Sequence, residues 1–204
     1  LDAATLRTRQ RSTGTRRVPR TALIPLIIAC ALFMENLDST VLSTSLPQIA
    51  AAFGESPVRL SFAITAYLFS LAVFIPISGW VADRYGGRNV FRAAIVVFLV
   101  GSVLCGLSGS LPELVAARLL QGLGGAMMVP VGRLVLLRSV DKSELVTAMA
   151  YLTVPALIGP VVGPLLGGFI TTYFHWRWIF WINIPIAILG LVLATIHIPD
   201  VREE

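Results

Sequence analysis

The sequence predicts an all-α polytopic membrane protein whose chain crosses the bilayer six times. Of the 204 residues, 56% are hydrophobic and only 13% are charged, whereas a water-soluble domain carries about 25% charged residues. Apolar runs long enough to cross a bilayer, roughly 20 residues each, follow one another along almost the whole chain. Backbone groups in hydrocarbon must be bonded internally, and the runs lack the alternation of barrel strands, so we expect helices.

The six spans are expected, in chain order, at residues 21–47, 60–82, 89–107, 112–135, 147–172 and 178–198. Each is near the ~20 residues that a membrane-crossing helix needs. The organisation that follows is a disordered, Arg-rich cytoplasmic tail over residues 1–20, a six-helix transmembrane bundle over 21–198, and the start of a cytoplasmic linker over 199–204.

The tail holds six arginines against a single acid, Asp2, and the remainder of the chain is neutral. The tail has no aromatic side chain on which a base could stack, so we expect no nucleic-acid partner and interpret it as an anchor near anionic lipid headgroups. Arg16 and Arg17 precede an apolar run, as in a secretion signal. That run is too long for a signal core and no small-residue cleavage site follows, so we expect the first span to be retained.

Orientation follows from the lysines and arginines, which collect in short cytoplasmic loops. With the amino terminus inside, the inner segments hold thirteen of them and the outer loops two, Arg59 and Arg177. We therefore expect a multi-pass protein of the inner (plasma) membrane with both termini cytoplasmic.

Several residue types that carry chemistry in enzymes are placed here where they cannot do so. Cys30 and Cys105 lie inside apolar runs, which indicates neither a disulfide framework nor a metal site. His175 and His197 lie near opposite membrane faces. No G-x-x-x-x-G-K-[ST] phosphate loop occurs, and the glycine run at 122–125 lies within a span, which excludes a dinucleotide turn. We expect a protein that is not an enzyme and has no cofactor.

The ionisable residues inside the first and fourth spans are the informative ones, because such groups usually face a bundle interior or a water-filled cavity. Counted from the outer ends of the spans, Asp38 lies roughly 13 Å deep and Glu35 roughly 18 Å, while Arg118 lies roughly 9 Å and Gln121 roughly 13 Å deep. Asp38, Arg118 and Gln121 therefore share a layer.

Glu35 and Asp38 are three residues apart and share a helical face, so two carboxylates and one guanidinium could meet in a cavity. Such a cluster can exchange a proton. The alternative is a static buried ion pair that only fixes helix packing. That alternative leaves Glu35 without a partner.

The inner end of the second span places Asp83 at a helix carboxyl terminus, where the helix dipole disfavours a carboxylate by about 0.3–1 kcal/mol. We therefore expect a compensating partner, either an arginine or the amino end of another helix. Gly86 and Gly87 allow a tight turn. An ordinary polar loop would suit Arg84 and Arg88 but leaves Asp83 unexplained.

The fifth span carries Gly159, Gly163 and Gly167 four residues apart on one face, where small residues let helices touch closely. Pro160 and Pro164 each remove a backbone donor and favour a bend. A packing motif and a functional hinge are both compatible with this pattern.

Three tryptophans, Trp176, Trp178 and Trp181, stand at the outer end of the sixth span. Aromatic rings collect at the headgroup level, so we interpret them as an interfacial belt that sets helix depth. A direct role in substrate binding is the alternative.

Taken together, these motifs resemble the major facilitator superfamily, and most closely its fourteen-helix drug:proton antiporter branch, over about residues 21–200. The resemblance rests on five segments in order, which are similar to a first-helix signature (37–47), the gating loop (79–88), a fourth-helix proton motif (118–126), the antiporter motif (159–168) and a sixth-helix signature that includes Asn183 (176–185).

The motifs and the resemblance together imply three groups of site residues. These are Asp38, Glu35, Arg118 and Gln121 for proton coupling; Gly79, Asp83, Arg84, Gly86 and Arg88 for the gating loop; and Gly159, Pro160, Gly163, Pro164, Gly167 and Gly168 for the antiporter helix. Gly87 stands where the gating loop usually has a basic residue, so the charge relay would depend on Arg88. Ala150 replaces an upstream glycine, and Glu35 is an acid that the general pattern does not require.

The resemblance implies the amino-terminal half of a proton-coupled exporter of small amphipathic compounds or drugs, working by alternating access. Its expected partners are the lipid bilayer, a proton, a small-molecule substrate and a second six-helix half, which would be the chain's own carboxyl-terminal half, a homodimer mate or a separate chain. Because the chain stops after the sixth span and begins with leucine, we expect a fragment or a truncated gene product. The rival interpretation is a non-transporting six-helix scaffold, a sensor or a degenerate transporter remnant.

Overall fold

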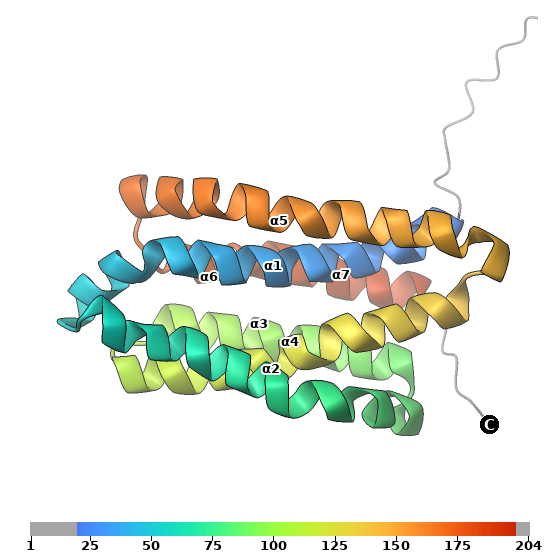
Figure 1. Cartoon of the computed structure of the whole chain (residues 1–204), viewed down its shortest axis with the longest axis horizontal. Helices are drawn as coiled ribbons and strands as arrows, with labels where there is room; N and C mark the ends of the chain where they lie inside the picture. Colours follow the sequence, from blue (N-terminus) through green and yellow to red (C-terminus); the bar gives the residue numbers. More distant parts are fainter. Residues whose placement is uncertain (1–19, 199–204) are drawn as a thin grey trace, which may run out of the picture.

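The computed structural model describes residues 20–198, and within that range it consists of helices and short connections (Figure 1). The helices are α1 (Arg20–Phe53), α2 (Pro57–Tyr85), α3 (Gly87–Leu107), α4 (Leu111–Ser139), a one-turn 3₁₀ helix η1 (Lys142–Glu144), α5 (Leu145–Tyr173), α6 (Trp178–Trp181) and α7 (Asn183–His197). The predicted linker and the predicted tail, apart from Arg20, lie outside the described residues.

All six predicted spans are present between residues 20 and 198, and each is long and apolar enough to cross a membrane. Most are longer than predicted. The span expected to end at Pro47 continues to Phe53, and α4 continues to Ser139 rather than to 135. The extension of α1 is itself mostly apolar, with Gln48 as the one polar residue among 48–53, so the helix does not end at Pro47. A proline inside a helix removes one donor and bends the helix without ending it.

The sixth span differs from the single helix expected over residues 178–198, because it is interrupted at Ile182 between α6 and α7. Pro185, in the first turn of α7, has no N–H to donate to the carbonyl of Trp181 one turn earlier. The interruption lies within the apolar run Trp178–His197, which is long enough to cross a membrane. It places Asn183 at the start of α7.

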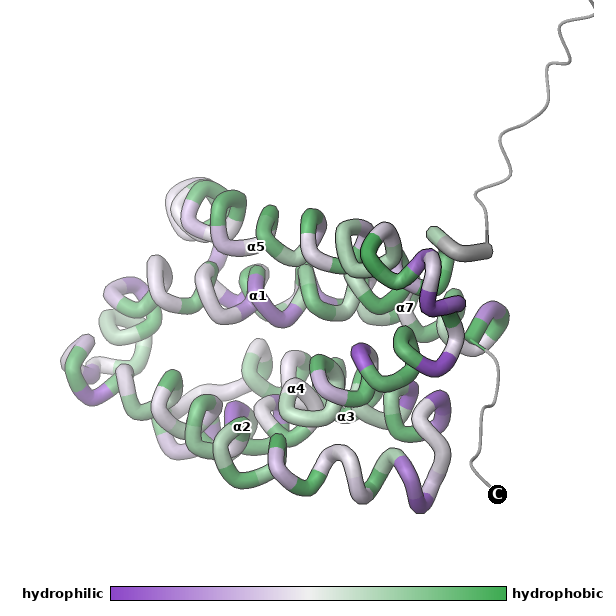
Figure 2. Tube along the Cα trace, turned by 45° about the vertical axis from the view of Figure 1, so that its right-hand side comes forward, coloured by the Kyte–Doolittle hydropathy of each residue, from purple (hydrophilic) through white to green (hydrophobic). Residues whose placement is uncertain are grey.

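The helices form two layers of three spans (Figure 1). One layer contains α1, α5 and the α6–α7 span, and the other contains α2, α3 and α4, with α7 contacting both α1 and α3. Hydrophobic residues dominate the lengths of the helices, and many of the hydrophilic residues lie near their ends (Figure 2). This arrangement suits a bundle that spans a bilayer.

The core is divided into two hydrophobic clusters along the bundle. One cluster, towards the end of the bundle where Gly86 joins α2 to α3, includes Ile28, Phe91 and Phe98, and the other, towards the opposite end, includes Leu114 and Phe180. The buried polar residues Asp38, Arg118, Gln121, Ser102 and Asn183 lie between the two clusters along their helices. The fold therefore has a polar layer in the middle of an apolar core.

Candidate functional site

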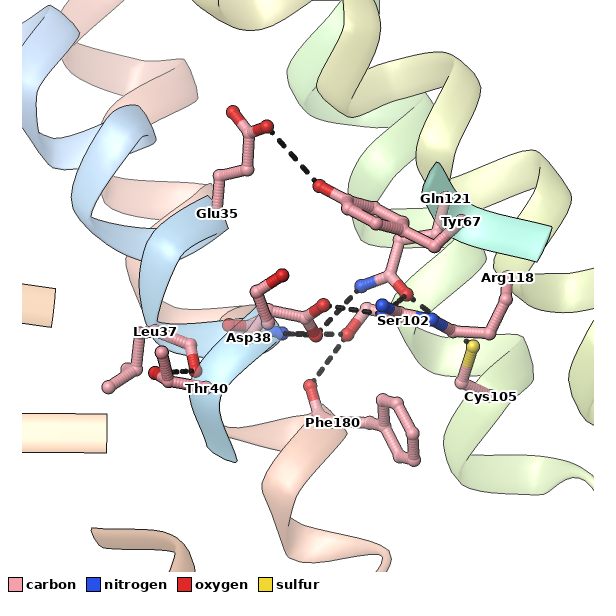
Figure 3. A network of polar contacts seen from close by, with 12 residues as sticks. Glu35, Leu37, Asp38, Thr40, Tyr67, Ser102, Cys105, Arg118, Gln121 and Phe180 are labelled. Atoms are coloured by element: carbon pink, nitrogen blue, oxygen red, sulfur yellow. Dashed lines mark hydrogen bonds and ion pairs between the residues drawn. The ribbon is translucent and has the colours of Figure 1, made fainter. Parts of the chain in front are cut away.

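The central polar layer is built around Asp38 of α1 and Arg118 of α4 (Figure 3). Arg118 Nη1 donates to Asp38 Oδ2 at 2.5 Å, and Gln121 Nε2 donates to Asp38 Oδ1 at 2.9 Å. Arg118 and Gln121 are fully buried and Asp38 is 2% exposed. The prediction that these three residues share a layer is confirmed.

Arg118 has further partners that compensate for its burial. Its Nη1 also donates to Gln121 Oε1 at 2.6 Å, and its guanidinium lies over the face of the Tyr67 ring from α2. Such contacts help to offset the loss of water by both charges of a buried ion pair, although the buried Arg118 Nε has no hydrogen-bond partner among the described residues. Arg118 contacts both Asp38 of α1 and Tyr67 of α2, so this side chain connects the two layers of the bundle.

Glu35 lies one turn from Asp38 on α1 but does not join the ion pair. It accepts a hydrogen bond from the Tyr67 hydroxyl at 3.3 Å through Oε1, while its buried Oε2 has no partner among the described residues (Figure 3). Three residues along a helix correspond to a rise of about 4.5 Å, which carries Glu35 away from the level of Arg118. Asp38 and Arg118 are therefore in direct contact, and Glu35 is connected to them only through Tyr67.

Three residues of this layer were not identified from their residue types alone, namely Tyr67, Ser102 and Asn183. Asn183 Nδ2 donates to Asp38 Oδ1 at 2.9 Å and to Ser102 Oγ at 3.0 Å. Tyrosine and serine inside apolar spans carry no charge and do not stand out in a sequence. The available signal was Asn183, which is part of the sixth-helix signature and stands two residues before Pro185.

The glycines that follow Gln121 allow close helix packing. A Cβ atom at Gly124 would lie 2.5 Å from the backbone nitrogen of Phe98 on α3, and one at Gly125 would lie 2.6 Å from the Tyr67 hydroxyl on α2. Neither space admits a side chain. The glycine run of α4 therefore holds α2 and α3 against it, and leaves room for Tyr67 to reach Glu35.

At the carboxyl end of α2, Asp83 has the arginine partner that was expected from its unfavourable position. Arg138 of α4 donates from Nη2 to Asp83 Oδ1 at 3.0 Å. Gly86 makes the turn into α3 with a φ of 85°, a conformation that L side chains rarely adopt. Arg88, on which the charge relay was expected to depend, instead donates to the carbonyl of Thr195 on α7 at 2.5 Å. The other predicted loop residues, Gly79 and Arg84, are exposed.

The three spaced glycines of α5 lie against α1, which confirms the predicted close approach. A Cβ at Gly159 would lie 2.9 Å from that of Asn36, and the other two would meet threonine side chains. The contacts pair Gly159 with Asn36, Gly163 with Thr40 and Gly167 with Thr44. Gly168 has open space around it, and Pro160 and Pro164 are exposed. α5 thus packs directly behind the turn of α1 that carries Asp38.

The three tryptophans expected to form an interfacial belt differ in exposure. Trp178 is 51% exposed, whereas Trp176 is 4% exposed and packs edge-to-face with Phe53 at a centroid distance of 5.5 Å. Trp181 is half-buried against Gly106. Of the three, Trp178 alone has the exposure that contact with headgroups needs, since Trp176 belongs to the hydrophobic cluster that includes Leu114 and Phe180.

The described residues contain no group of three or more His, Cys, Asp or Glu side chains that could hold a metal ion. The polar layer instead consists of one ion pair, two amides and a serine, with Glu35 and Tyr67 on the side of the cluster that includes Phe98. Such groups can bind and release protons and can donate or accept hydrogen bonds.

Comparison with known proteins gives consistent matches. The family model described as Major Facilitator Superfamily matches residues 28–204. The chain is 48% identical to proteins named "Putative multidrug resistance protein MdtD", over 178 residues in Salmonella paratyphi B and 174 residues in Salmonella typhimurium. These matches cover 87% and 85% of this chain but only 38% and 37% of those relatives, so the chain spans well under half of their length.

The fold is similar to those of solved transporters. A D-xylose-proton symporter superposes with a TM-score of 0.77 at 17% identity, over 87% of this chain and 48% of the symporter. A bacterial homolog of the human lysosomal transporter Spinster, in an inward-facing and unoccupied conformation, superposes with a TM-score of 0.70 at 17% identity, over 92% of this chain and 45% of the other. The family model, the curated relatives and the fold agree, and the chain belongs to the major facilitator superfamily of membrane transporters.

Proposed function

We propose that this chain is the amino-terminal half of a proton-coupled exporter that works by alternating access. The observation that carries the proposal is the buried ion pair of Asp38 and Arg118, which connects α1 to α4 in the middle of the bundle. A carboxylate and a guanidinium at this depth stabilise each other. A proton on Asp38 would neutralise one partner, free Arg118, and change the contacts that decide which face of the transporter is open.

Glu35 is proposed as a second group that takes part in proton coupling. Its Oε2 atom is buried and has no recorded partner, so the carboxyl group is poorly satisfied as a charged group. Tyr67 touches both Glu35 and Arg118, which provides a physical connection between the second acid and the ion pair. Gln121 completes the set because it donates to Asp38 and accepts from Arg118.

The proposed substrates are small amphipathic compounds or drugs. This class comes from the name of the curated relatives, which are called multidrug resistance proteins, and from the fourteen-helix antiporter branch that the motifs resemble. The proposed location is the inner membrane with both termini cytoplasmic, which places the Asp83–Arg138 contact at the cytoplasmic face.

A second six-helix half is proposed as the partner that completes the transporter. The most apolar stretches of α2 and α5 are only 28% and 17% buried, against 56% for those of α1 and α4. The chain also spans only 38% of a curated relative. The chain's own carboxyl-terminal half, a homodimer mate or a separate chain would cover the exposed faces, and the six-helix chain on its own should not transport.

The test is proton-driven accumulation of a fluorescent amphipathic dye in everted vesicles that contain the chain with its second half. The unaltered assembly should accumulate dye until the proton gradient is collapsed, and Asp38→Asn should abolish accumulation. Asp141→Asn is the matched control, because Asp141 is an exposed acid outside the polar layer. If the unaltered assembly moved no dye under a proton gradient, the six-helix chain would be a scaffold rather than a coupled transporter. If Asp38→Asn transported normally, the assembly would be a transporter in which Asp38 does not couple transport to protons.

A further inference from the structure

Asn183 is the only contribution that α7 makes to the recorded hydrogen bonds of Asp38 within residues 20–198. Its Nδ2 atom donates to Asp38 Oδ1 at 2.9 Å, on the same oxygen that accepts from Gln121. Asn183 is fully buried. The Asp38 carboxylate therefore accepts hydrogen bonds from three donors on two helices.

Ser102 of α3 fixes the direction of this amide. The Ser102 hydroxyl donates to the carbonyl of Phe180 at 2.8 Å (Figure 3). It accepts from Asn183 Nδ2 at 3.0 Å. Because the hydroxyl hydrogen is committed to Phe180, the Ser102 oxygen can only accept from the amide. The side of Asn183 that faces Ser102 and Asp38 must then be its NH₂ group.

This orientation of the Asn183 amide leaves its oxygen without a hydrogen bond within residues 20–198. Asn183 Oδ1 is buried and has no hydrogen-bond partner among the described residues. Turning the amide over would place this oxygen against the carboxylate of Asp38, and the two acceptors would repel each other. The amide thus leaves its own oxygen unsatisfied in an arrangement that suits a negatively charged Asp38.

The local backbone explains how Asn183 reaches this position. The helix is interrupted at Ile182, so α7 starts at Asn183 with the residue directed into the core. On α3, Gly106 has no side chain and Trp181 packs against it. This close packing holds the α6 segment near α3, which brings the carbonyl of Phe180 within reach of Ser102.

The titratable and charged groups that interact with Asp38 come from four helices. They are Arg118 of α4 in the ion pair, Glu35 of α1, Tyr67 of α2 and Cys105 of α3. Asn183 adds an uncharged donor to this set. We infer that Asn183, held by Ser102, is a positioning residue that sets the pH at which Asp38 takes up its proton, an inference that rests on the proposed proton coupling.

The test measures the pH dependence of Asp38 labelling by a hydrophobic carbodiimide, which modifies protonated carboxyl groups inside membranes. The unaltered chain and its variants, with their second half, are labelled in native membranes in a Glu35→Gln background, and the Asp38 peptide is quantified by mass spectrometry. Asn183→Ala should move the labelling midpoint to higher pH by on the order of one unit, because the charged form loses a donor. Ser102→Ala should move it in the same direction by a smaller amount.

The matched control is Ser45→Ala, because Ser45 is also fully buried but its hydroxyl bonds only to Val41 on its own helix in the recorded contacts. It should leave the midpoint unchanged. If Asn183→Ala does not fold, Asn183→Asp keeps the volume and replaces the donor with a second acid, and its midpoint should also rise. A midpoint like that of the unaltered chain in both Asn183 variants would overturn the inference.

Because labelling requires no transport, the two proposals fail separately. Shifted midpoints in an assembly that shows no proton-driven flux would leave Asn183 as a positioning residue and remove the coupled-transport function. Normal proton-driven flux with unshifted midpoints would keep the coupled-transport function and remove Asn183 as a positioning residue.

Discussion

The guanidinium carbon of Arg118 lies 4.2 Å from the centre of the Tyr67 ring. The same tyrosine donates its hydroxyl to Glu35, so one uncharged side chain contacts both the ion pair and the second acid of the bundle. A cation over an aromatic face is stabilised more strongly when water is excluded, as it is here. Tyr67 therefore has two separable roles, one for its ring and one for its hydroxyl.

Tyr67→Phe should leave the ring over Arg118 and remove only the hydrogen bond to Glu35. We expect a loss of about 1 kcal/mol in the free energy of unfolding. Tyr67→Leu removes the cation–ring contact and leaves a cavity, so it should cost about 2–5 kcal/mol. Unfolding in detergent micelles measures both. Tyr151→Phe, at a tyrosine that is 43% exposed, is the control and should change little. Equal losses for the two Tyr67 variants would contradict separate roles.

Arg118→Leu should destabilise the bundle by about 3–5 kcal/mol, because it leaves the buried charge of Asp38 uncompensated. Adding Asp38→Asn should recover part of that loss, since the double variant has no unpaired charge. The same unfolding measurement, arranged as a double-mutant cycle, reports the coupling between the two positions. Purely additive losses would mean that the two side chains do not depend on each other.

Gly163→Ala and Gly168→Ala form a matched pair on α5. A methyl group at Gly163 would collide with Thr40 of α1, so we expect a loss of about 1–3 kcal/mol. A methyl group at Gly168 would enter open space, and replacing a helical glycine there should stabilise by up to about 1 kcal/mol. If the two variants had the same stability, α5 would not be packed against α1 through this face.

Asp83→Asn should loosen the inner end of the bundle without unfolding it. The Asp83 side chain is 56% exposed, so its pair with Arg138 contributes at most about 1 kcal/mol. Single cysteines in the last turns of α2 and α4, in a chain with Cys30 and Cys105 replaced by serine, should react faster with a thiol reagent. Asp141→Asn should not change the reaction rate. If Asp83→Asn also left the reaction rates of both cysteines unchanged, the turn between α2 and α3 would only connect the two helices.

The membrane orientation can be tested with single cysteines at Glu55 and Lys142. Glu55 is in the short connection between α1 and α2, and Lys142 is in η1 at the opposite end of the bundle. With both termini cytoplasmic, an impermeant thiol reagent applied to intact cells should label position 55 and spare position 142. Permeabilised cells, in which both positions should react, provide the control. The reverse pattern on intact cells would overturn the orientation.

The fold was predictable from sequence because each apolar run is as long as a bilayer is thick. The contact between Asp38 and Arg118 was predictable for a related reason: two charges in apolar runs must find each other. The predicted depths of these residues in the membrane depended on an incorrect helix end, although the shared layer that they predicted is present. The prediction placed the end of the first helix at Pro47, whereas α1 runs to Phe53 and projects beyond the outer end of α4 (Figure 1).

The rest of the polar layer could not be predicted because it depends on how neighbouring helices are rotated. Tyr67 and Ser102 are uncharged and lie in apolar spans, where most such residues would face lipid or bond to their own helix, as the Ser45 hydroxyl does. The separation of Glu35 from the ion pair was hidden for the same reason. Residue spacing places it on the face of Asp38, but only packing shows that Tyr67 stands between it and Arg118.

The connection between α2 and α3 is a single residue, Gly86, which is at once the end of one helix and the start of the next. A connection of one residue is too short for α2 and α3 to move far relative to each other at this end. We therefore expect a tilt of the carboxyl end of α2 to move the start of α3. Because Arg88 of α3 donates a hydrogen bond to the carbonyl of Thr195, the same tilt should also affect α7. The ends of α2, α3 and α7 on this side of the bundle are thus linked through one residue and one hydrogen bond. We expect that inserting a few flexible residues at Gly86 would uncouple movements of α2 from those of α3 and α7.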